Sequence, residues 1–286
     1  MADRCFVRAA LLAILSFGCI RQIPAVPAPT NDDLILTVFD CGYGDSLLLS
    51  HHGRHLVIDG GYPSFGPAFL AALDALGVRS VDAVFLTHPH PDHIGGAYAV
   101  LASDRPVDGV YACHPASHPE MPVGIREACE RRQIPWHAFC AGERYRFGDR
   151  IELEALHPGN PGPDLNETSL VLMVRYGACR LLLPADIGSG AQGALARTDP
   201  QALKCDVLKA PHHGGDFDYA FLRAAAPSHV LLSVGMNPYG NPWDSFLWTC
   251  RMIGAAVHRT DEAGTIQCRI VPSGRIRIVS IPRLDD

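Results

Sequence analysis

The sequence has no excess of positive charge: 24 Lys plus Arg stand against 30 Asp plus Glu, and the formal net charge is −6. It therefore lacks a global field that would attract nucleic acid, and a polyanionic partner would need a local basic patch. It also contains no Cys-x-x-Cys pair, which argues against a zinc site built from thiolates. No internal repeat is visible, so a repeat architecture is not expected.

The 286 residues are 48% hydrophobic, which is enough to bury one large core. Strand-like apolar runs dominate the first half of the chain, whereas helical and strand-like patterns alternate in the second half. This order predicts an α/β fold in which two stacked sheets carry helices on their outer faces. We predict one catalytic domain over residues 34–286.

The amino-terminal segment has the features of an export signal. Arg4 and Arg8 precede an apolar stretch at 9–18 that is too short to span a bilayer but long enough for a signal-peptide core. Residues 16–19 read SFGC and resemble a bacterial lipobox, although Phe17 fits it poorly. We predict a signal peptide at 1–19, a location in the cell envelope, and a membrane anchor through a lipid on Cys19. An ordinary cleaved signal and an apolar core helix are the alternatives.

Residues 20–33 contain three prolines and predict an extended linker between the membrane and the domain. Export would permit disulfide bonds. Three cysteines lie close together in a predicted insertion. One disulfide could form among them, but the sequence does not choose the pair: Cys113, Cys129 and Cys140. Four others stand in or beside apolar strands and are expected to be small buried side chains: Cys41, Cys179, Cys205 and Cys268.

Residues 88–93 hold three histidines and one aspartate directly after the apolar run 81–86. Side chains alternate along an extended segment, and the prolines at 89 and 91 keep the backbone extended, so His88 and His90 should point to one side. Asp92 and His93 then turn away together. These two sets of ligands suit two adjacent cations better than one. The alternative is a polar loop whose histidines are satisfied locally.

Other polar side chains are less specific. Asp59 ends a predicted strand and precedes two glycines, which places a carboxylate at a turn. His114 and His118 lie in a proline-rich loop, where they could cap an active site or be plain loop histidines. We favour the loop interpretation for both.

With these motifs in view, the chain resembles the metallo-β-lactamase superfamily, and within it the hydrolase domain of ComEC-type competence proteins. The resemblance runs from about residue 34 to 281 and implies a four-layer αββα sandwich with metals at one edge of the sheets. The matching blocks are 39–46, 58–61, 88–96, 166–171, 183–186, 207–214, 233–235 and 259–261.

The resemblance also assigns ligands. It implies that Asp186 bridges two metals and that His213 is the late histidine ligand, with His212 as its rival or as a substrate contact. In this subgroup an Asn stands in the block that usually supplies a third-motif histidine. Here Asn166 occupies it, and His157 lies nearby, so both are candidates for metal or substrate contact.

Some positions depart from the subgroup pattern. Tyr43 replaces the usual Gln, Pro184-Ala185 replace the Thr-Gly before the aspartate, and Gly215 replaces a Ser. Asn241 stands where His is frequent, which would remove a proton donor or a substrate contact. The resemblance therefore supports the metal ligands more strongly than it supports a particular substrate.

The resulting prediction is an exported metallohydrolase with two divalent cations, zinc first and manganese as the alternative. A hydroxide on the metals would attack the substrate, and Asp92 and Asp186 would cancel only part of the cationic charge. A phosphodiester suits such a site, with a nucleic acid or an envelope polymer as its source; no protein partner is evident. The alternatives are hydrolysis of a lactone, a β-lactam or a thioester, or a noncatalytic envelope binding module that retains metal.

Overall fold

The computed structural model describes residues 29–282. The predicted signal peptide at 1–19, Cys19, most of the predicted linker at 20–33 and the last four residues lie outside the described part. The end of the linker packs on the domain. Thr30 donates a hydrogen bond from Oγ1 to Oδ1 of Asp33 at 2.8 Å, and the Tyr176 hydroxyl donates to the carbonyl of Asp32 at 2.5 Å.

The first sheet of the described chain has eight strands, in the order β15-β14-β1-β2-β3-β4-β5-β6. Neighbours from β15 to β3 are antiparallel, and those from β3 to β6 are parallel. In chain order the strands are β1 (Leu34–Val38), β2 (Ser46–His51), β3 (Arg54–Asp59), β4 (Ala83–Phe85), β5 (Val110–Ala112), β6 (Trp136–Ala138), β14 (Thr265–Ile270) and β15 (Ile276–Ile281).

The second sheet has seven strands, in the order β13-β12-β11-β10-β9-β8-β7. It repeats the division of the first, because neighbours from β13 to β10 are parallel and those from β10 to β7 are antiparallel. The strands are β7 (Arg144–Phe147), β8 (Ile151–His157), β9 (Val171–Tyr176), β10 (Cys179–Leu183), β11 (Val207–Lys209), β12 (His229–Leu232) and β13 (Ala256–Arg259).

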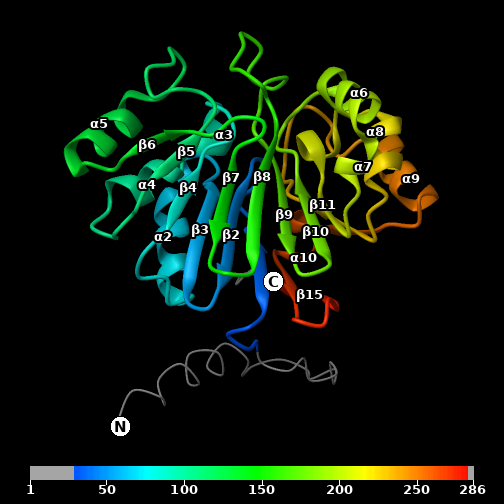
Figure 1. The fold of residues 1–286 in the computed structure, drawn as a ribbon, viewed down its shortest axis with the longest axis horizontal. Helices are drawn as coiled ribbons and strands as arrows, with labels where there is room; N and C mark the ends of the chain where they lie inside the picture. Colours follow the sequence, from blue (N-terminus) through cyan, green and yellow to red (C-terminus); the bar gives the residue numbers. More distant parts are fainter. Residues whose placement is uncertain (1–28, 283–286) are drawn as a thin grey trace.

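Helices cover the outer face of each sheet (Figure 1). On the first sheet these are α2 (Gly66–Ala75), α4 (Ala97–Ala102) and α5 (Val123–Arg132). On the second they are α6 (Ser189–Thr198), α7 (Pro200–Leu203), α8 (Tyr219–Ala225) and α9 (Asp244–Met252). Four shorter elements are η1 (Pro63–Phe65), α3 (Pro91–Ile94), η2 (Pro211–Gly214) and α10 (Thr260–Ala263). Within residues 29–282, no helix combines the length and apolar character needed to span a membrane.

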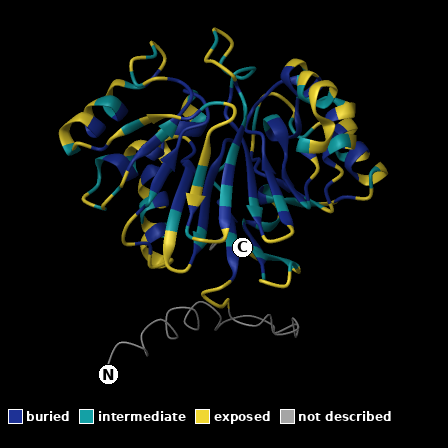
Figure 2. Ribbon diagram, in the orientation of Figure 1, coloured by how far each residue is buried: buried dark blue, intermediate teal, exposed yellow. Residues whose placement is uncertain are grey.

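The core is layered as the fold requires. In β3, Leu56 and Ile58 pack into the cluster between the two sheets, whereas Val57 faces the helices. In β10, Leu181 belongs to the same inter-sheet cluster and Leu182 packs under the other helices. The central strands are therefore buried on both faces (Figure 2), which explains their continuous apolar runs. The predicted four-layer αββα sandwich is confirmed.

The strand bounds differ slightly from those that apolar runs predict. Hydrophobicity extends over 81–86, but β4 covers only Ala83–Phe85, and Val81 makes an isolated bridge with Val107. Burial of the flanking residues, rather than ladder pairing, accounts for the longer apolar run. Residues 177–178 form the turn between the antiparallel strands β9 and β10.

Two glycines allow the segment with the histidines to approach the end of β3. A Cβ on Gly96 would lie 2.0 Å from the carbonyl oxygen of Gly60, so no side chain fits there. The Gly60 amide donates to the carbonyl of His93 at 2.6 Å. This contact holds α3 against the carboxyl end of β3, where Asp59 lies.

Candidate metal centre

The candidate site forms where carboxyl ends of parallel strands from both sheets meet. In the first sheet, β3 ends at Asp59, and the chain after β4 delivers residues 87–93. In the second sheet, β10 leads to Asp186 and β11 leads to His213 in η2. Carboxyl ends of parallel strands are where open α/β sheets place their ligand sites.

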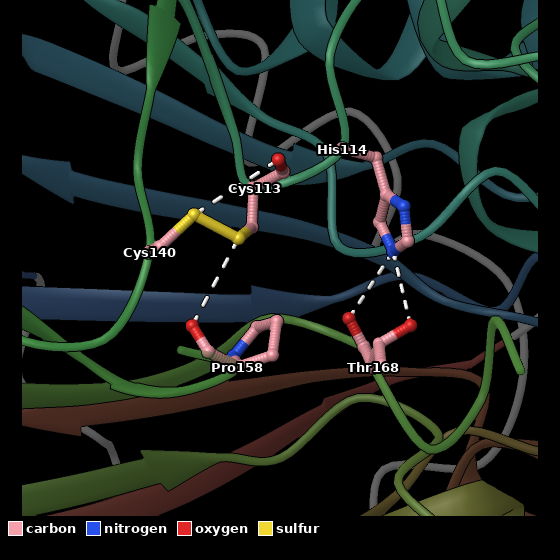
Figure 3. The surroundings of a disulfide bond; sticks show 5 residues. All are labelled: Cys113, His114, Cys140, Pro158 and Thr168. Carbon is pink, nitrogen blue, oxygen red and sulfur yellow. Dashed lines mark hydrogen bonds between the residues drawn. A yellow bond between two sulfur atoms is a disulfide. The ribbon is translucent and has the colours of Figure 1, made fainter. Parts of the chain in front are cut away.

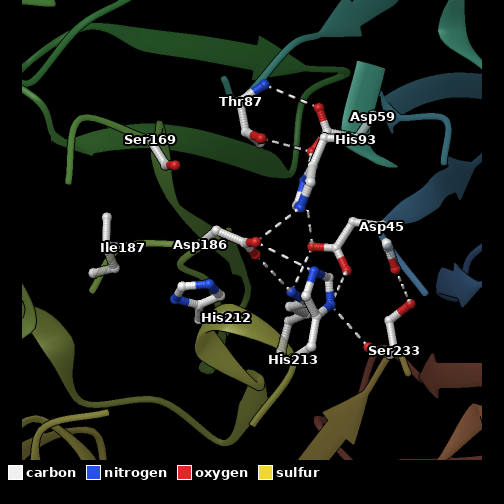
Figure 4. Close-up of polar contacts among 12 residues, drawn as sticks. Asp45, Asp59, Thr87, His93, Ser169, Asp186, Ile187, His212, His213 and Ser233 are labelled. Carbon is white, nitrogen blue, oxygen red and sulfur yellow. Dashed lines mark hydrogen bonds and ion pairs between the residues drawn. The ribbon is translucent and has the colours of Figure 1, made fainter. Parts of the chain in front are cut away.

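Four of the predicted ligands converge in one cluster, and Figure 4 shows three of them, His93, Asp186 and His213. Each of Asp92, His93, Asp186 and His213 contributes a ligand atom, and these atoms lie within 4.8 Å of one another. Oδ2 of Asp186 is 3.1 Å from Nε2 of His93 and 3.2 Å from Nε2 of His213. Oδ2 of Asp92 is 3.8 Å from the same nitrogen of His213. The structure therefore brings these four predicted residues together, and their role as metal ligands stays a prediction.

Hydrogen bonds behind the two imidazoles fix their orientation. Nδ1 of His93 lies 2.8 Å from Oδ2 of Asp59, and Nδ1 of His213 lies 3.0 Å from the carbonyl oxygen of Ser233. Both partners accept, so each Nδ1 carries the proton when the ring is neutral. The lone pair of each Nε2 then points at Asp186. Outer partners of this kind orient metal-binding histidines.

The other predicted pair lies beside this cluster. Nε2 of His88 is 3.0 Å from Nδ1 of His90, and the rings of His88 and His93 are 4.2 Å apart between centroids. Thr87 donates its hydroxyl proton to Asp59, so Oγ1 of Thr87 accepts from Nδ1 of His88 at 3.1 Å. A lone pair of His88 is thereby turned toward His90. The described chain thus has a dimetal-like site of His and Asp side chains.

The electrostatics of the cluster favour positive charge at its centre. Burial alone lowers the pKa of His93, but the carboxylates of Asp186 and Asp59 outweigh it and hold this pKa well above the ordinary value. Burial raises the pKa of the Asp186 carboxyl, but His213 and His93 hold it well below its usual range. Burial, reinforced by the charge of His93, keeps the pKa of His88 well below that of an ordinary histidine. Burial thus opposes protonation of His88, which suits a metal ligand.

The donor set fits divalent cations. Nε2 of His93 and Nε2 of His213 are buried and have charged contacts with carboxylates but no neutral hydrogen-bond partner among the described residues, and Oδ1 of Asp186 faces only the Lys209 ammonium at 3.8 Å. Buried polar atoms without such partners are rare, and here they converge from different elements. Imidazole and carboxylate together suit zinc or manganese. The residues that would hold the cations are His88, His90, Asp92, His93, Asp186 and His213.

His157 is the last residue of β8, and Asn166 lies in the loop that follows this strand. Nε2 of His157 donates to the carbonyl of Glu167 at 2.7 Å, which ties the end of β8 to that loop. His157 does not belong to the four-residue cluster. Oδ1 of Asn166 is buried without a hydrogen-bond partner among the described residues. Asn166 lines a pocket of about 680 Å³ together with His90, which suits a contact to substrate.

His212 and Asn241 lie on the other side of the cluster. Nδ1 of His212 is buried without a hydrogen bond in the described part of the chain, and burial lowers the pKa of this histidine. Asn241 donates from Nδ2 to the Tyr43 hydroxyl at 2.9 Å, and the Tyr43 ring lies 4.4 Å from that of His213. Two departures from the subgroup pattern, at positions 43 and 241, therefore contact each other beside the candidate ligand His213.

A further departure bears on the backbone at Asp186. Ala185 has φ +48°, in the left-handed region that favours glycine, which is the residue usual for the subgroup. The Ala185 carbonyl accepts from the amide of His212 at 3.0 Å. This bond links the turn that carries Asp186 to the one that carries His213.

Three functional side chains lacked a role in the sequence prediction. Asp59 was recognised only as a strand-end carboxylate, and it holds His93. Asp45 and Lys209 form an ion pair at 2.5 Å, with side chains 2% and 0% exposed. A charged residue inside an otherwise apolar strand was the signal for Lys209, because such a residue is rarely buried without a partner.

A disulfide bond joins the chain just after β5 to the chain just after β6 (Figure 3). Cys113 pairs with Cys140, while Cys129 is free and buried, which resolves the open choice among the three. The next residue, His114, is buried, and its Nε2 donates to the carbonyl of Thr168 at 3.2 Å. His118 lines the pocket with His90. The interpretation of both as loop histidines stays a prediction.

Removing the disulfide should lower the free energy of unfolding by about 3–4 kcal/mol, because it closes a loop with a sequence separation of 27. The comparison is urea unfolding of the wild type against Cys113→Ser/Cys140→Ser. Cys129→Ala is the matched control, since it removes a buried free thiol and should cost only about 1 kcal/mol. Equal stability of the wild type and the double variant would contradict the expectation.

Comparisons with known proteins were consistent with this geometry. The family model described as the Metallo-beta-lactamase superfamily matches residues 39–235. Competence protein ComA of Neisseria gonorrhoeae is 31% identical over 263 residues, which cover 90% of this chain and 35% of that protein. ComE operon protein 3 of Bacillus subtilis is 28% identical over 254 residues, covering 81% and 32%. The chain thus spans about a third of the length of these relatives.

Solved structures show the same fold. YhfI from Bacillus subtilis, a metallo-beta-lactamase fold protein, has a TM-score of 0.55 at 16% identity, covering 83% of this chain and 99% of YhfI. CmlA, a diiron beta-hydroxylase from Streptomyces venezuelae, has a TM-score of 0.55 at 15% identity, covering 89% and 55%. The layered sheets and the extent of the sequence match together identify this chain as a member of the metallo-β-lactamase superfamily.

Proposed function

We propose that the chain is an exported, metal-dependent hydrolase that acts on phosphodiesters. The observation that carries this proposal is the convergence of Asp92, His93, Asp186 and His213 within 4.8 Å, beside the pair His88 and His90. A purely structural metal site would be closed by four ligands. Here there are six candidate ligands, and one of them, His90, lines a pocket, which suits two cations that remain accessible to a substrate.

Two bound divalent cations, zinc or manganese, would lower the pKa of a water molecule and stabilise the charge of an in-line displacement at phosphorus. The protein residues hold and orient these cations. Asp92 is the most exposed member of the cluster, at 15%, so it lies nearest to an incoming substrate. Because Asp92 and Asp186 cancel only part of the cationic charge, an anionic transition state is stabilised.

The source of the phosphodiester is proposed to be a nucleic acid or an envelope polymer. Similarity to a competence protein supports a nucleic acid. The net charge of −6 and the two carboxylates of Glu120 and Asp164 at the pocket disfavour a long polyanion lying across that wall. A substrate would therefore present its phosphate at the cluster and a less charged group to the pocket.

We also propose that the chain is anchored in the envelope through a lipid on Cys19. The Cys113–Cys140 disulfide supports export, because such bonds persist in oxidising compartments. Mass spectrometry of the protein from its native host should find an acylated mature terminus at Cys19, and Cys19→Ser should abolish it. An intact Met1 or an unlipidated mature terminus would remove this proposal.

A substrate panel tests the activity. Purified protein with measured metal content would be given a bis-aryl phosphodiester, single-stranded DNA, a lactone, a β-lactam and a thioester. We expect hydrolysis of a phosphodiester, abolished by exhaustive chelation and restored by Zn²⁺ or Mn²⁺. Cleavage of only the lactone, β-lactam or thioester would replace the proposed substrate class. Bound metal without any turnover would favour a binding module.

A further inference from the structure

A fully buried lysine lies directly behind the cluster. Lys209 ends β11, four residues before His213, and its side chain is 0% exposed. Within residues 29–282 it is the one buried Lys or Arg. The other lysine of the sequence, Lys204, is exposed. Removing a cation from water costs free energy unless acidic groups surround the cation. The contacts of Lys209 therefore indicate its role.

The ammonium of Lys209 lies between two carboxylates. Nζ is 2.5 Å from Oδ2 of Asp45 and 3.8 Å from Oδ1 of Asp186. The two carboxylate oxygens of Asp186 therefore have different partners. Oδ1 faces the ammonium, whereas Oδ2 faces Nε2 of His93 and Nε2 of His213 at 3.1 and 3.2 Å. If this carboxylate rotated freely, neither oxygen would keep a fixed position toward the two histidines.

Asp45 joins the lysine to the rest of the site. Its Oδ1 is 3.7 Å from Nδ1 of His213, and its Oδ2 is 4.0 Å from Nδ1 of His93, the nitrogens turned away from Asp186. Its backbone amide donates to the carbonyl of Asp92 at 3.1 Å. The carboxylate of Asp45 thus lies behind both imidazoles and holds the ammonium against Asp186.

A stability role alone does not explain this pair. Hydrophobic residues of similar volume often replace a buried ion pair without loss of stability. This pair bridges the two sheets where four ligands converge, and one of its partners contacts a ligand carboxylate.

We propose that Lys209, held by Asp45, is a positioning residue for the metal centre: it fixes Oδ1 of Asp186 so that Oδ2 is presented to the cations. This inference rests on the metal centre of the proposed function, but not on its substrate. Residues that orient ligands in this way typically change metal affinity by about 10–100-fold.

The test measures Zn²⁺ binding by competition with a chromophoric chelator, without substrate. The key variant is Asp45→Asn/Lys209→Met, which removes the pair without leaving an unpaired buried charge. We expect its Zn²⁺ affinity to fall about 10–100-fold, with circular dichroism unchanged. Lys204→Met is the matched control and should bind as the wild type does. Wild-type affinity in the double variant would overturn the proposal.

A second measurement uses the wild-type protein and so does not depend on how the variants fold. Protein labelled with ¹³C-lysine has two lysine ε-methylene signals, because the sequence has two lysines, and Lys204→Met assigns them. Titration with Zn²⁺ should shift the Lys209 signal until the site is full and leave Lys204 unchanged. An unmoved Lys209 signal despite Zn²⁺ binding would overturn the positioning role. Zn²⁺ binding without phosphodiester hydrolysis would defeat the proposed function alone.

Discussion

Replacing Asp186 by Asn is expected to remove metal and to lower phosphodiester hydrolysis by about a thousand-fold. Oδ2 of Asp186 is the atom shared by both imidazoles of the cluster, at 3.1 and 3.2 Å. Cations at such a site supply several kcal/mol of transition-state stabilisation, and about 4 kcal/mol corresponds to a thousand-fold in rate. An amide has the same shape but carries no charge, so the loss reports the carboxylate itself.

The measurements are metal per chain by elemental analysis and kcat/KM on the bis-aryl phosphodiester. Asp206→Asn is the matched control, because Asp206 accepts a hydrogen bond from the amide of Arg180 in the same sheet but belongs to no ligand cluster. It should keep both metals and near wild-type activity. If Asp186→Asn also keeps two metals per chain and full hydrolysis, the assignment of Asp186 as a ligand is wrong.

The local part of the site could be predicted from the sequence. Alternation along an extended segment places His88 and His90 together, and the turn after Pro91 carries His93 toward Asp59. These geometries depend on neighbouring residues, so a single motif specifies them. The layered fold was also predictable, because strands buried on both faces read as continuous apolar runs.

Contacts between distant segments could not be predicted in the same way. Asp45 and Lys209 are 164 positions apart, and only the stacking of the two sheets brings them together. A lysine after the apolar residues of β11 indicates that Lys209 needs an acidic partner, but it does not identify Asp45 as that partner. The pairing of Cys113 with Cys140 could not be predicted for the same reason, because proximity in sequence does not rank the possible pairs among three cysteines.

The third-motif segment shows a different limit. His157 stands near the block where a ligand is usual, but Nε2 of His157 donates to the Glu167 carbonyl instead. A histidine pattern indicates the capacity to bind metal, not the direction of the ring. Hydrogen bonding within the 158–168 loop sets that direction, and the spacing of apolar residues does not indicate it.

Replacing Asp59 by Asn is expected to lower metal affinity or activity by about 10–100-fold while leaving all six candidate ligands in place. Oδ2 of Asp59 accepts from Nδ1 of His93 at 2.8 Å and from the Thr87 hydroxyl at 2.6 Å. Oδ1 accepts from the Thr87 amide at 2.9 Å. One carboxylate therefore orients both His93 and, through Thr87, His88.

An asparagine at 59 has a single acceptor oxygen for these three donors, so its NH₂ group must face one of them. Where that group meets His93, it favours the ring tautomer with the proton on Nε2, which cannot bind a cation. Asp82→Asn is the matched control, because Asp82 accepts from the Arg54 side chain and the His55 amide in a position that touches no candidate ligand. Zn²⁺ competition and kcat/KM would be measured for both variants beside thermal unfolding. Loss of affinity in Asp59→Asn, with Asp82→Asn unchanged, assigns the effect to the orientation of the imidazoles. Equal Zn²⁺ affinity in Asp59→Asn and the wild type would instead mean that the ligands hold their geometry without Asp59.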